Sequence, residues 1–402
     1  MLTYQQALQL VLESTRPLPA TNVGLDDGLG KILAADQHAV RNLPAADNSA
    51  MDGYAFALEG LDADGTLKDV GFLPAGGSFS GRVQAGQAVR IMTGAALPPG
   101  CDTVIPIEDV EPFGEGIIKL RKQPRRGEHV RYRGEEAQDG ERILTAGTRL
   151  DAGAVGLLAA AGIRQVAVYP APRVALLSTG DELCALDATD DTSRVIDSNS
   201  HLLAARLRED GFVPVCLGIA KDHPEELENC LRRGLAADVL ITSGGVSVGD
   251  RDHVQEVLTT LGFEKIFWKV AIKPGKPVLF GCIGHQPVFG LPGNPAASAA
   301  TYELFVRPAL RRLAGYPDPL APRLKVRLAE AIKGGGKRQL FMWGCVRADQ
   351  GRLSFFPSAR QGSGQNRSLQ AANALLPVAI DAPPLEAGSE VEIILLRLPS
   401  LL

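Results

Sequence analysis

The sequence predicts a multidomain α/β and β protein: a central three-layer α/β/α domain, with a β-rich module inserted before it and a small β domain after it. The 402 residues exceed what one hydrophobic core usually supports, so roughly two to four domains are expected. Residues 172–316 alternate strand-like and helix-like segments, which is typical of a parallel sheet with helices on both faces. Residues 43–143 and 317–402 contain short apolar runs separated by Gly and Pro, which is typical of β structure.

The composition is that of an ordinary globular protein, with 45% hydrophobic and 22% charged residues. A net charge of -4 gives no global field that would attract nucleic acid or anionic lipid, so we expect neither as a partner and any anion site must be local. The six cysteines include no C-x-x-C pair and no His at zinc-ligand spacing, which indicates reduced thiols. No secretory signal follows Met1, and Arg164 interrupts the longest weakly polar stretch, so we expect a cytoplasmic protein without a membrane span.

The first part of the chain is expected to be a helical and linking segment made of two stretches, residues 1–42 and 144–171. Thr3–Gln6 fits a capping box, and apolar residues then recur at helical spacing as far as Ser14. The stiff sequence Pro170–Pro172 predicts a boundary near Pro172.

The central domain, residues 172–316, is expected to contain four strands and four helices in alternation. The strands are predicted at Val174–Leu177, Val213–Leu217, Val239–Thr242 and Val278–Phe280, and the helices at Ser200–Glu209, Pro224–Leu235, His253–Leu261 and Pro295–Leu313. Strand-like runs such as Leu324–Leu328 and Val391–Leu396 predict the C-terminal β domain, residues 317–402.

Two of the predicted strands are followed by turns that combine small residues with carboxylates. Ser178–Glu182 follows the first strand, and Thr242–Asp252 follows the strand at 239–241. Ligands of open parallel sheets bind at the carboxyl ends of the strands. Glycines, hydroxyls and a helix N-terminus suit a phosphate group. The alternative is a tight βα turn without a ligand, but the repetition at several strand ends favours a binding site.

Two later loops add basic and polar groups. Lys273–Pro277 presents two ammonium groups in a loop stiffened by prolines, and these could offset phosphate charge; an exposed Pro-Gly turn is the structural alternative. Gly290–Pro295 places Pro295 in a first helical turn after Asn294, which fits an N-cap. Capping alone explains Asn294.

The β-rich module carries three further polar clusters, at Asp47–Tyr54, Met92–Ala95 and Arg133–Glu136. Asp47 and Asp52 fit Asx turns as well as a binding site, and the third cluster fits a solvated group of charges. Each cluster is a weak signal by itself.

Taken together, these segments resemble the molybdopterin molybdenumtransferase family, which includes MoeA and the E domain of gephyrin. The resemblance covers almost the whole chain. The most specific matches are Asn48–Ala55, Ile91–Ala95, Leu177–Leu183, Thr242–Gly249, Ile272–Pro277 and Gly290–Pro295.

The resemblance implies a central domain of the molybdopterin-binding type in an elongated homodimer. The active site would be shared between subunits, with Asp52 and Thr93 of one subunit facing Glu182 and Asp252 of the other. The implied reaction inserts molybdate into adenylylated molybdopterin, with Mg²⁺-dependent release of AMP. Other molybdenum cofactor synthesis proteins are implied as partners.

The site residues follow from the motif matches. The implied catalytic residues are Asp52, Thr93, Glu182 and Asp252, and the implied metal ligands are Asp52, Glu182, Asp252 and Glu136. The implied substrate-binding residues are Ser178, Thr179, Gly180, Asp222, Ser243, Gly244, Gly245, Ser247, Gly249, Lys273, Lys276, Pro292, Pro295, Arg338, Ser363 and Ser368. Two positions depart from the family pattern, because Glu136 stands where Asp is usual and Trp343 where Arg is usual.

Two other functions compete with this interpretation. A scaffold or clustering protein of the gephyrin type is disfavoured because no long linker or second cofactor domain is attached and the carboxylates are present. A nucleotide-processing hydrolase built on the same α/β domain would not need the module that carries Asp52 and Thr93. Molybdate and tungstate are too alike for the sequence to separate them.

Overall fold

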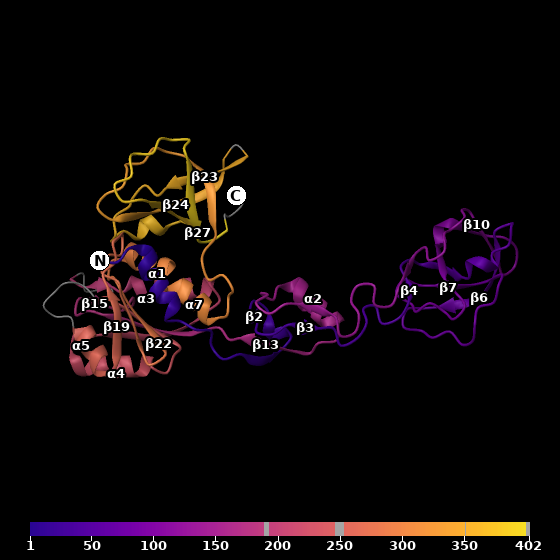
Figure 1. The fold of residues 1–402 in the computed structure, drawn as a ribbon, viewed down its shortest axis with the longest axis horizontal. Helices are drawn as coiled ribbons and strands as arrows, with labels where there is room; N and C mark the ends of the chain where they lie inside the picture. The colour runs from indigo at the N-terminus through magenta and orange to yellow at the C-terminus, as the bar shows by residue number, and fades with distance from the viewer. Residues whose placement is uncertain (189–192, 246–252, 350, 399–402) are drawn as a thin grey trace. The chain divides into compact units, whose positions relative to one another are not determined.

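The structure is a computed structural model that describes residues 1–188, 193–245, 253–349 and 351–398 (Figure 1). The chain forms two compact units. Unit 1 comprises Met1–Thr21, Gly30–Ile32 and Tyr169–Leu402, and unit 2 comprises Asn22–Leu29 and Leu33–Val168.

Unit 1 is built around a six-stranded sheet. Its strand order is β17 (Val213–Ala220), β14 (Arg173–Thr179), β18 (Val239–Ser243), β22 (Gln286–Leu291), β21 (Leu279–Ile283) and β19 (Phe263–Trp268). The first four strands are parallel, but β21 pairs antiparallel with both of its neighbours. The all-parallel sheet expected from the strand and helix order is therefore wrong at one edge. Only Gly284 and His285 separate β21 from β22, and a two-residue turn permits a hairpin but no parallel crossover.

Helices cover both faces of this sheet, which confirms the predicted three-layer domain. Val174 and Leu176 of β14 pack in one core with α3, whereas Ala175 and Leu177 pack in a second core with α4 and α5. Successive strand residues point to opposite faces, so a buried run such as that of β14 fills both cores. The helices are α1 (Tyr4–Glu13), α3 (Ser198–Glu209), α4 (Pro224–Gly234), α5 (His253–Thr260), α6 (Pro295–Thr301), the π-helical segment η4 (Tyr302–Val306) and α7 (Arg307–Leu313).

The N-terminal helix α1 packs on this domain next to α7 (Figure 1). Thr3 and Gln6 form the predicted capping box at its start, with the Gln6 amide donating to Thr3 Oγ1 and the Thr3 amide donating to Gln6 Oε1. The Tyr4 ring lies 5.0 Å from the ring of Phe341 and 5.7 Å from that of Phe305. This aromatic contact joins the α/β core to the C-terminal β domain.

The C-terminal β domain is a closed sheet. Strand β24 pairs with both β25 and β26, so the order returns to its starting strand and leaves few free edges. Its strands are β23 (Arg323–Leu328), β24 (Gln339–Asp349), β25 (Arg352–Pro357), β26 (Ala374–Val378) and β27 (Glu390–Leu395), with β20 (Ile272–Lys273) added on β24 and the short helix η5 (Asn366–Leu369) beside it. A two-stranded flap, β15 (Leu183–Cys184) and β16 (Val195–Ile196), precedes α3.

Unit 2 contains a six-stranded β sheet with a core on each face, together with smaller pieces. The sheet order is β8 (Thr103–Pro106), β5 (Gly53–Phe56), β7 (Gln87–Ile91), β6 (Thr66–Leu73), β10 (Ile117–Leu120) and β9 (Val110–Pro112). The smaller pieces, of which β1, β2 and β13 each have one terminal residue in unit 1, are β1 (Thr21–Gly24), β2 (Ile32–Leu33), β3 (Gln37–His38), β4 (Asn48–Ser49), β11 (Val130–Arg131), β12 (Arg142–Leu144), α2 (Ala152–Ala160), β13 (Gln165–Tyr169) and the 3₁₀ turns η1 (Asp26–Gly28), η2 (Leu58–Gly60) and η3 (Ile107–Asp109).

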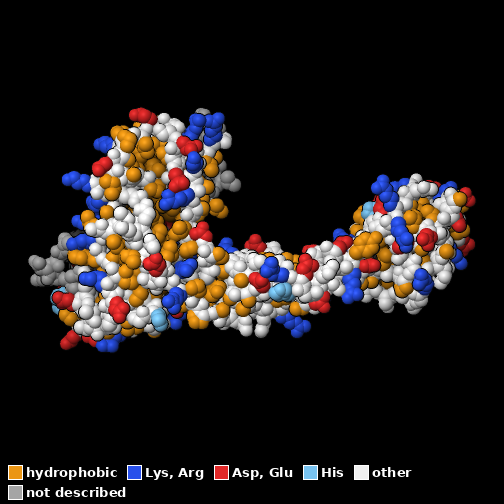
Figure 2. Space-filling model, viewed as in Figure 1, with side chains coloured by type: hydrophobic (Ala, Val, Ile, Leu, Met, Phe, Trp, Pro, Cys, Tyr) orange, Lys and Arg blue, Asp and Glu red, His pale blue; other side chains and the backbone are white. Residues whose placement is uncertain are grey.

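Basic and acidic side chains are interspersed on the visible face of each unit, as Figure 2 shows. Across the described ranges, no helix combines the length and the hydropathy that a membrane crossing requires.

Candidate functional site

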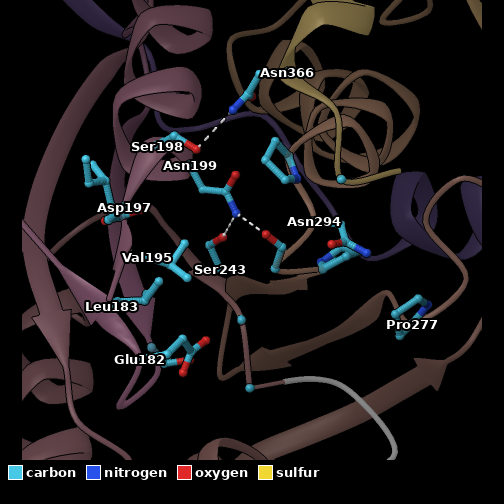
Figure 3. Close-up of a pocket in the computed structure, with 18 residues that line it drawn as sticks. Glu182, Leu183, Val195, Asp197, Ser198, Asn199, Ser243, Pro277, Asn294 and Asn366 are labelled. Carbon is cyan, nitrogen blue, oxygen red and sulfur yellow. Dashed lines mark hydrogen bonds between the residues drawn. The ribbon is translucent and has the colours of Figure 1, made fainter. Parts of the chain in front are cut away.

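A pocket of about 860 Å³ opens at the carboxyl ends of β14, β18 and β22 (Figure 3). We call it the acidic pocket, because the charged side chains that line it among the described residues are those of Glu182 and Asp197. The remaining lining residues are Thr179, Leu183, Val195, Ile196, Ser198, Asn199, Ser243, Gly244, Gly245, Pro277, Pro292, Gly293, Asn294, Pro295, Gly364 and Asn366. The pocket therefore lies where ligands of open α/β sheets bind.

Asn199, in the first turn of α3, connects two strand ends across this pocket. Its Nδ2 donates to Ser243 Oγ at 2.9 Å and to the Gly293 carbonyl at 2.8 Å (Figure 3). Its Oδ1 is buried and accepts no hydrogen bond from the described residues. Sequence reasoning missed Asn199, although the run of helix-capping residue types at 197–200 marked the start of a helix there.

Two glycines keep the pocket floor in place. Gly244 has a φ of +93°, and a Cβ there would lie 2.4 Å from the Thr179 carbonyl oxygen. Gly180 has a φ of +148°, and a Cβ there would lie 2.6 Å from a Glu182 carboxylate oxygen. Any larger residue at either position would displace a group that lines the pocket.

Three carboxylates gather beside the acidic pocket. The Asp222 amide donates to Asp181 Oδ1 at 3.2 Å, and the pKa of Asp222 is raised by burial and then by the negative charges of Asp181 and Glu182. Repulsion between neighbouring carboxylates disfavours their ionisation unless a cation lies between them. The part of the chain that the structure describes contains no group of three or more His, Cys, Asp or Glu side chains arranged as a metal site.

A second pocket, of about 600 Å³, adjoins the first and is lined by cations. We call it the cationic pocket. Lys273, Lys276 and Arg338 line it, and Arg338 Nη1 also donates to the Ile272 carbonyl at 3.1 Å. The two pockets share Pro277, Pro292 and Asn294.

One loop of the C-terminal β domain, residues 362–366, lines both pockets. Asn294 Nδ2 donates to Ser363 Oγ at 3.3 Å, and the Ala296 amide donates to the Ser363 carbonyl at 2.9 Å. Asn366 Nδ2 donates to Ser198 Oγ at 3.4 Å (Figure 3). The C-terminal domain thus contributes directly to the walls of the site.

In unit 2, the structure brings together two of the predicted site residues. Asp52 Oδ1 accepts hydrogen bonds from the Thr93 amide and the Thr93 hydroxyl, both at 2.7 Å. These two bonds lower the pKa of Asp52, so its carboxylate is ionised at neutral pH. Glu136 is exposed in the same unit, and its amide donates to the Leu43 carbonyl at 3.0 Å.

The predicted site residues of unit 1 differ in where they lie. Thr179, Glu182, Ser243, Gly244, Gly245, Pro292 and Pro295 line the acidic pocket, and Lys273, Lys276, Pro292, Arg338 and Ser363 line the cationic pocket. Ser178 and Ser368 are buried and line neither pocket, while Gly180 and Asp222 lie beside Glu182. Ser247, Gly249 and Asp252 lie outside the described residues.

Trp343, which departs from the family pattern, is a core residue here. It is 1% exposed, and its Nε1 donates to the Ala296 carbonyl at 3.3 Å. It therefore anchors the C-terminal domain on the first turn of α6 instead of presenting a cation to a ligand.

Comparison with known proteins identifies the family. Residues 2–162 match the MoeA N-terminal region (domain I and II), residues 175–312 match a probable molybdopterin binding domain, and residues 325–396 match the MoeA C-terminal region (domain IV). The chain belongs to the molybdopterin molybdenumtransferase family. The resemblance seen in the motifs is thus confirmed, together with the expectation of a transferase in molybdenum cofactor biosynthesis.

Individual family members match over almost their full length. A molybdopterin molybdenumtransferase of Nostoc sp. is 37% identical over 381 residues, which are 92% of this chain and 87% of the relative. Molybdopterin molybdenumtransferase 2 of Mycobacterium tuberculosis is 34% identical and covers 98% and 99%. The crystal structure of a molybdopterin biosynthesis MoeA protein from Pyrococcus horikosii superposes with a TM-score of 0.84 at 30% identity, over 99% of both chains.

Proposed function

We propose that this chain inserts molybdate into adenylylated molybdopterin, with Mg²⁺-dependent release of AMP. The observation that carries the proposal is the pair of adjoining pockets, one lined by carboxylates and uncharged polar groups and the other by three cations. A ligand that carries both a heterocycle and phosphate groups fits two pockets of this kind, since each pocket complements one end of it.

The residues of the acidic pocket fit Mg²⁺. This ion needs only one or two carboxylates and fills its remaining positions with water and phosphate oxygens. Glu182 would supply one carboxylate. The pKa of the neighbouring Asp222 is raised by burial and then by negative charge that a cation would offset. When bound, Mg²⁺ polarises a phosphoryl oxygen. We propose Asp252 as the second carboxylate ligand of Mg²⁺.

Uncharged groups of the acidic pocket would hold the organic part of the substrate. Asn199 Oδ1 and Thr179 Oγ1 are buried and have no hydrogen-bond partner within the described ranges. A buried polar atom left in this state costs about 1–3 kcal/mol. An N–H group of a bound heterocycle would remove that cost at Asn199, which favours a ligand with ring N–H donors.

The cationic pocket would bind the anions. Molybdate is a dianion, so the carboxylates of the acidic pocket repel it and the ammonium groups of Lys273 and Lys276 attract it. Arg338 and Ser363 would add hydrogen-bond donors for molybdate or phosphate oxygens.

We further propose that the enzyme is a cytoplasmic homodimer with a shared site. In this arrangement Asp52 and Thr93 of one subunit complete the site around Glu182 of the other, and Glu136 is a candidate ligand at the same place. We propose that each subunit has four domains or segments. The first combines residues 1–42 and 144–171, and the others are residues 43–143, 172–316 and 317–402. Other molybdenum cofactor synthesis proteins would deliver or receive the substrates.

Release of AMP from adenylylated molybdopterin tests the proposed function. We expect release that requires both Mg²⁺ and molybdate, and that Asp52→Ala abolishes. Equal release without molybdate would support a nucleotide-processing hydrolase instead. No release and no binding of the substrate would support a scaffold.

Mixing two inactive variants tests the shared site. Heterodimers of Asp52→Ala and Glu182→Ala contain one intact site, so we expect the mixture to regain part of the activity. The absence of any recovery in verified heterodimers would contradict a site made from two subunits.

A further inference from the structure

A buried cluster of charges lies at the C-terminal end of α3, away from the pocket at its N-terminal end. Arg307 Nε lies 3.0 Å from Asp210 Oδ1, and Arg307 Nη1 lies 3.2 Å from Glu303 Oε2. The Glu303 and Asp210 side chains are 0% and 4% exposed. The Tyr302 hydroxyl also donates to Asp210 Oδ2 at 2.8 Å. These residues all belong to the α/β domain.

The C-terminal β domain adds Arg397, which follows β27, to this cluster. Its guanidinium nitrogens lie 3.2 Å from Glu209 Oε2, 3.4 Å from Asp210 Oδ1 and 3.4 Å from Glu303 Oε1. One guanidinium thus holds the last residue of α3, the residue after it and a residue of η4. A planar group with several fixed donors defines the orientation of its partners, which a single ammonium does less well.

The same domain touches α3 again at its other end, where Asn366 bonds to Ser198. Between the two ends, a hollow of about 350 Å³ separates part of α3 from the C-terminal domain; it is lined by Leu202, Ala205, Arg206, Glu209, Leu369, Ala371, Ala372, Asn373 and Arg397. The two ends of α3 lie about 18 Å apart, because the helix has twelve residues. Phe341 and Trp343 pack this domain on the α/β core elsewhere, and the polar contacts at the two ends of α3 add fixed points along this helix, on either side of the hollow.

We propose that Arg397 is a positioning residue for the candidate site. By pairing with the C-terminal end of α3, it orients the C-terminal β domain along this helix. The 362–366 loop is thereby held over the acidic and cationic pockets, where Ser363 and Asn366 bond to the α/β domain. The expected effect of Arg397 on the kinetics of AMP release rests on the proposed function. Its expected effect on the stability of the 362–366 loop does not.

Hydrogen exchange measures the structural consequence without any substrate. In Arg397→Met we expect the amides of 362–369 and of the first turn of α3 to exchange about tenfold faster, because the loop separates from Ser198 more often. Arg397→Lys keeps a charge and should restore part of the protection. Arg323→Met is the matched control: Arg323 pairs with Glu392 in the same domain at 2.7 Å, but both side chains are about half exposed.

A milder variant covers the case in which Arg397→Met fails to fold. Glu209→Gln changes a side chain that is 52% exposed and pairs with both Arg397 and Arg206, while the buried pairs of Asp210 and Glu303 with Arg307 remain intact. It should change the exchange of 362–369 in the same direction. Unchanged exchange in this loop, in a folded Arg397→Met or in Glu209→Gln, would overturn the proposal.

Steady-state AMP release then measures the functional consequence. We expect Arg397→Met to raise KM for the adenylylated substrate about fivefold while kcat changes less than twofold, since the residue orients a wall of the site and touches no reacting atom. Arg323→Met should leave both constants unchanged. Wild-type protein that releases no AMP would refute the proposed function but leave the exchange result valid. Equal kinetic effects in the two variants would overturn the positioning role.

Discussion

The acidic and cationic pockets share Pro277, Pro292 and Asn294 and yet carry opposite charge. The acidic pocket is formed by strand ends and the start of α3, whereas the cationic pocket is formed by the 273–277 loop and the C-terminal domain. Under the proposed function, this difference would divide the roles, with cation and heterocycle in the acidic pocket and oxyanions in the cationic pocket. One substrate spanning both pockets would be fixed in a single direction, because reversing it would place like charges together.

Neutralising the acidic pocket should have the largest effect. Glu182→Gln keeps the shape of the side chain but removes the charge that would hold the metal, so we expect AMP release to slow by about 100-fold or more. Raising the Mg²⁺ concentration should recover part of the rate. Glu225→Gln, at the exposed start of α4, is the control and should behave as wild type. A Glu182→Gln enzyme with normal rate and normal Mg²⁺ dependence would remove the basis for the distinction between the pockets.

Neutralising the cationic pocket should have a different signature. Lys276→Met should raise KM for molybdate about tenfold, because one of the charges attracting the dianion is lost. The concentration of Mg²⁺ that gives half-maximal rate should stay unchanged. Titrating molybdate and Mg²⁺ separately measures both quantities. If Lys276→Met shifted the Mg²⁺ requirement and left molybdate unaffected, the assignment of the two pockets would be reversed.

Much of this arrangement could be predicted from local sequence patterns. Buried β14 and β18 were visible as apolar runs, and the polar residues directly after them had to lie at the same edge of the sheet. Glycines at positions 180 and 244 were also recognisable, since they stand in turns between a strand and the next segment. Periodicity and turn chemistry are encoded over a few residues, so a single sequence reveals them.

The contacts between distant segments could not be predicted in this way. Asn199 meets Ser243 and Gly293, which are 44 and 94 residues away along the chain. Asn366 meets Ser198 across 168 residues. The local sequence pattern around Asn199 predicts only a first helical turn and does not indicate that this side chain bridges two strand ends. The same limit hid the core position of Trp343, because its Ala296 partner belongs to another domain of the chain.

Asn199 allows a stability test of how the acidic pocket is held together. Asn199→Asp loses a donor and places a carboxylate against the Gly293 carbonyl, so we expect a loss of about 2–3 kcal/mol in the free energy of unfolding. Urea denaturation at neutral pH measures this. Asn366→Asp is the control: its bond to Ser198 is longer and the residue is exposed, so the loss should be below about 0.5 kcal/mol. Equal losses would show that Asn199 does not bridge the strand ends.

Asp36 in unit 2 contrasts with the crowded Asp222 and should give the smallest effect. It accepts hydrogen bonds from the Ala146 amide at 2.8 Å and from Arg142 at 3.0 Å, and these lower its pKa below the ordinary 3.8. The carboxylate therefore stabilises the folded state above its unfolded pKa, and this contribution disappears as pH falls through the folded pKa. Wild type should melt slightly above Asp36→Asn at neutral pH, and the gap should close as the pH falls below 3.8 and through the folded pKa. A gap that widens on acidification would contradict this sign.

The stoichiometry of a single turnover tests the central claim most directly. Enzyme in excess over adenylylated molybdopterin, with Mg²⁺ and molybdate, should release one AMP for each molybdenum atom that becomes bound to the pterin product. Both events should slow together when Lys276 and Glu182 are both neutralised. If AMP is released while molybdenum stays free in solution, the two pockets do not act on one substrate and the account is wrong.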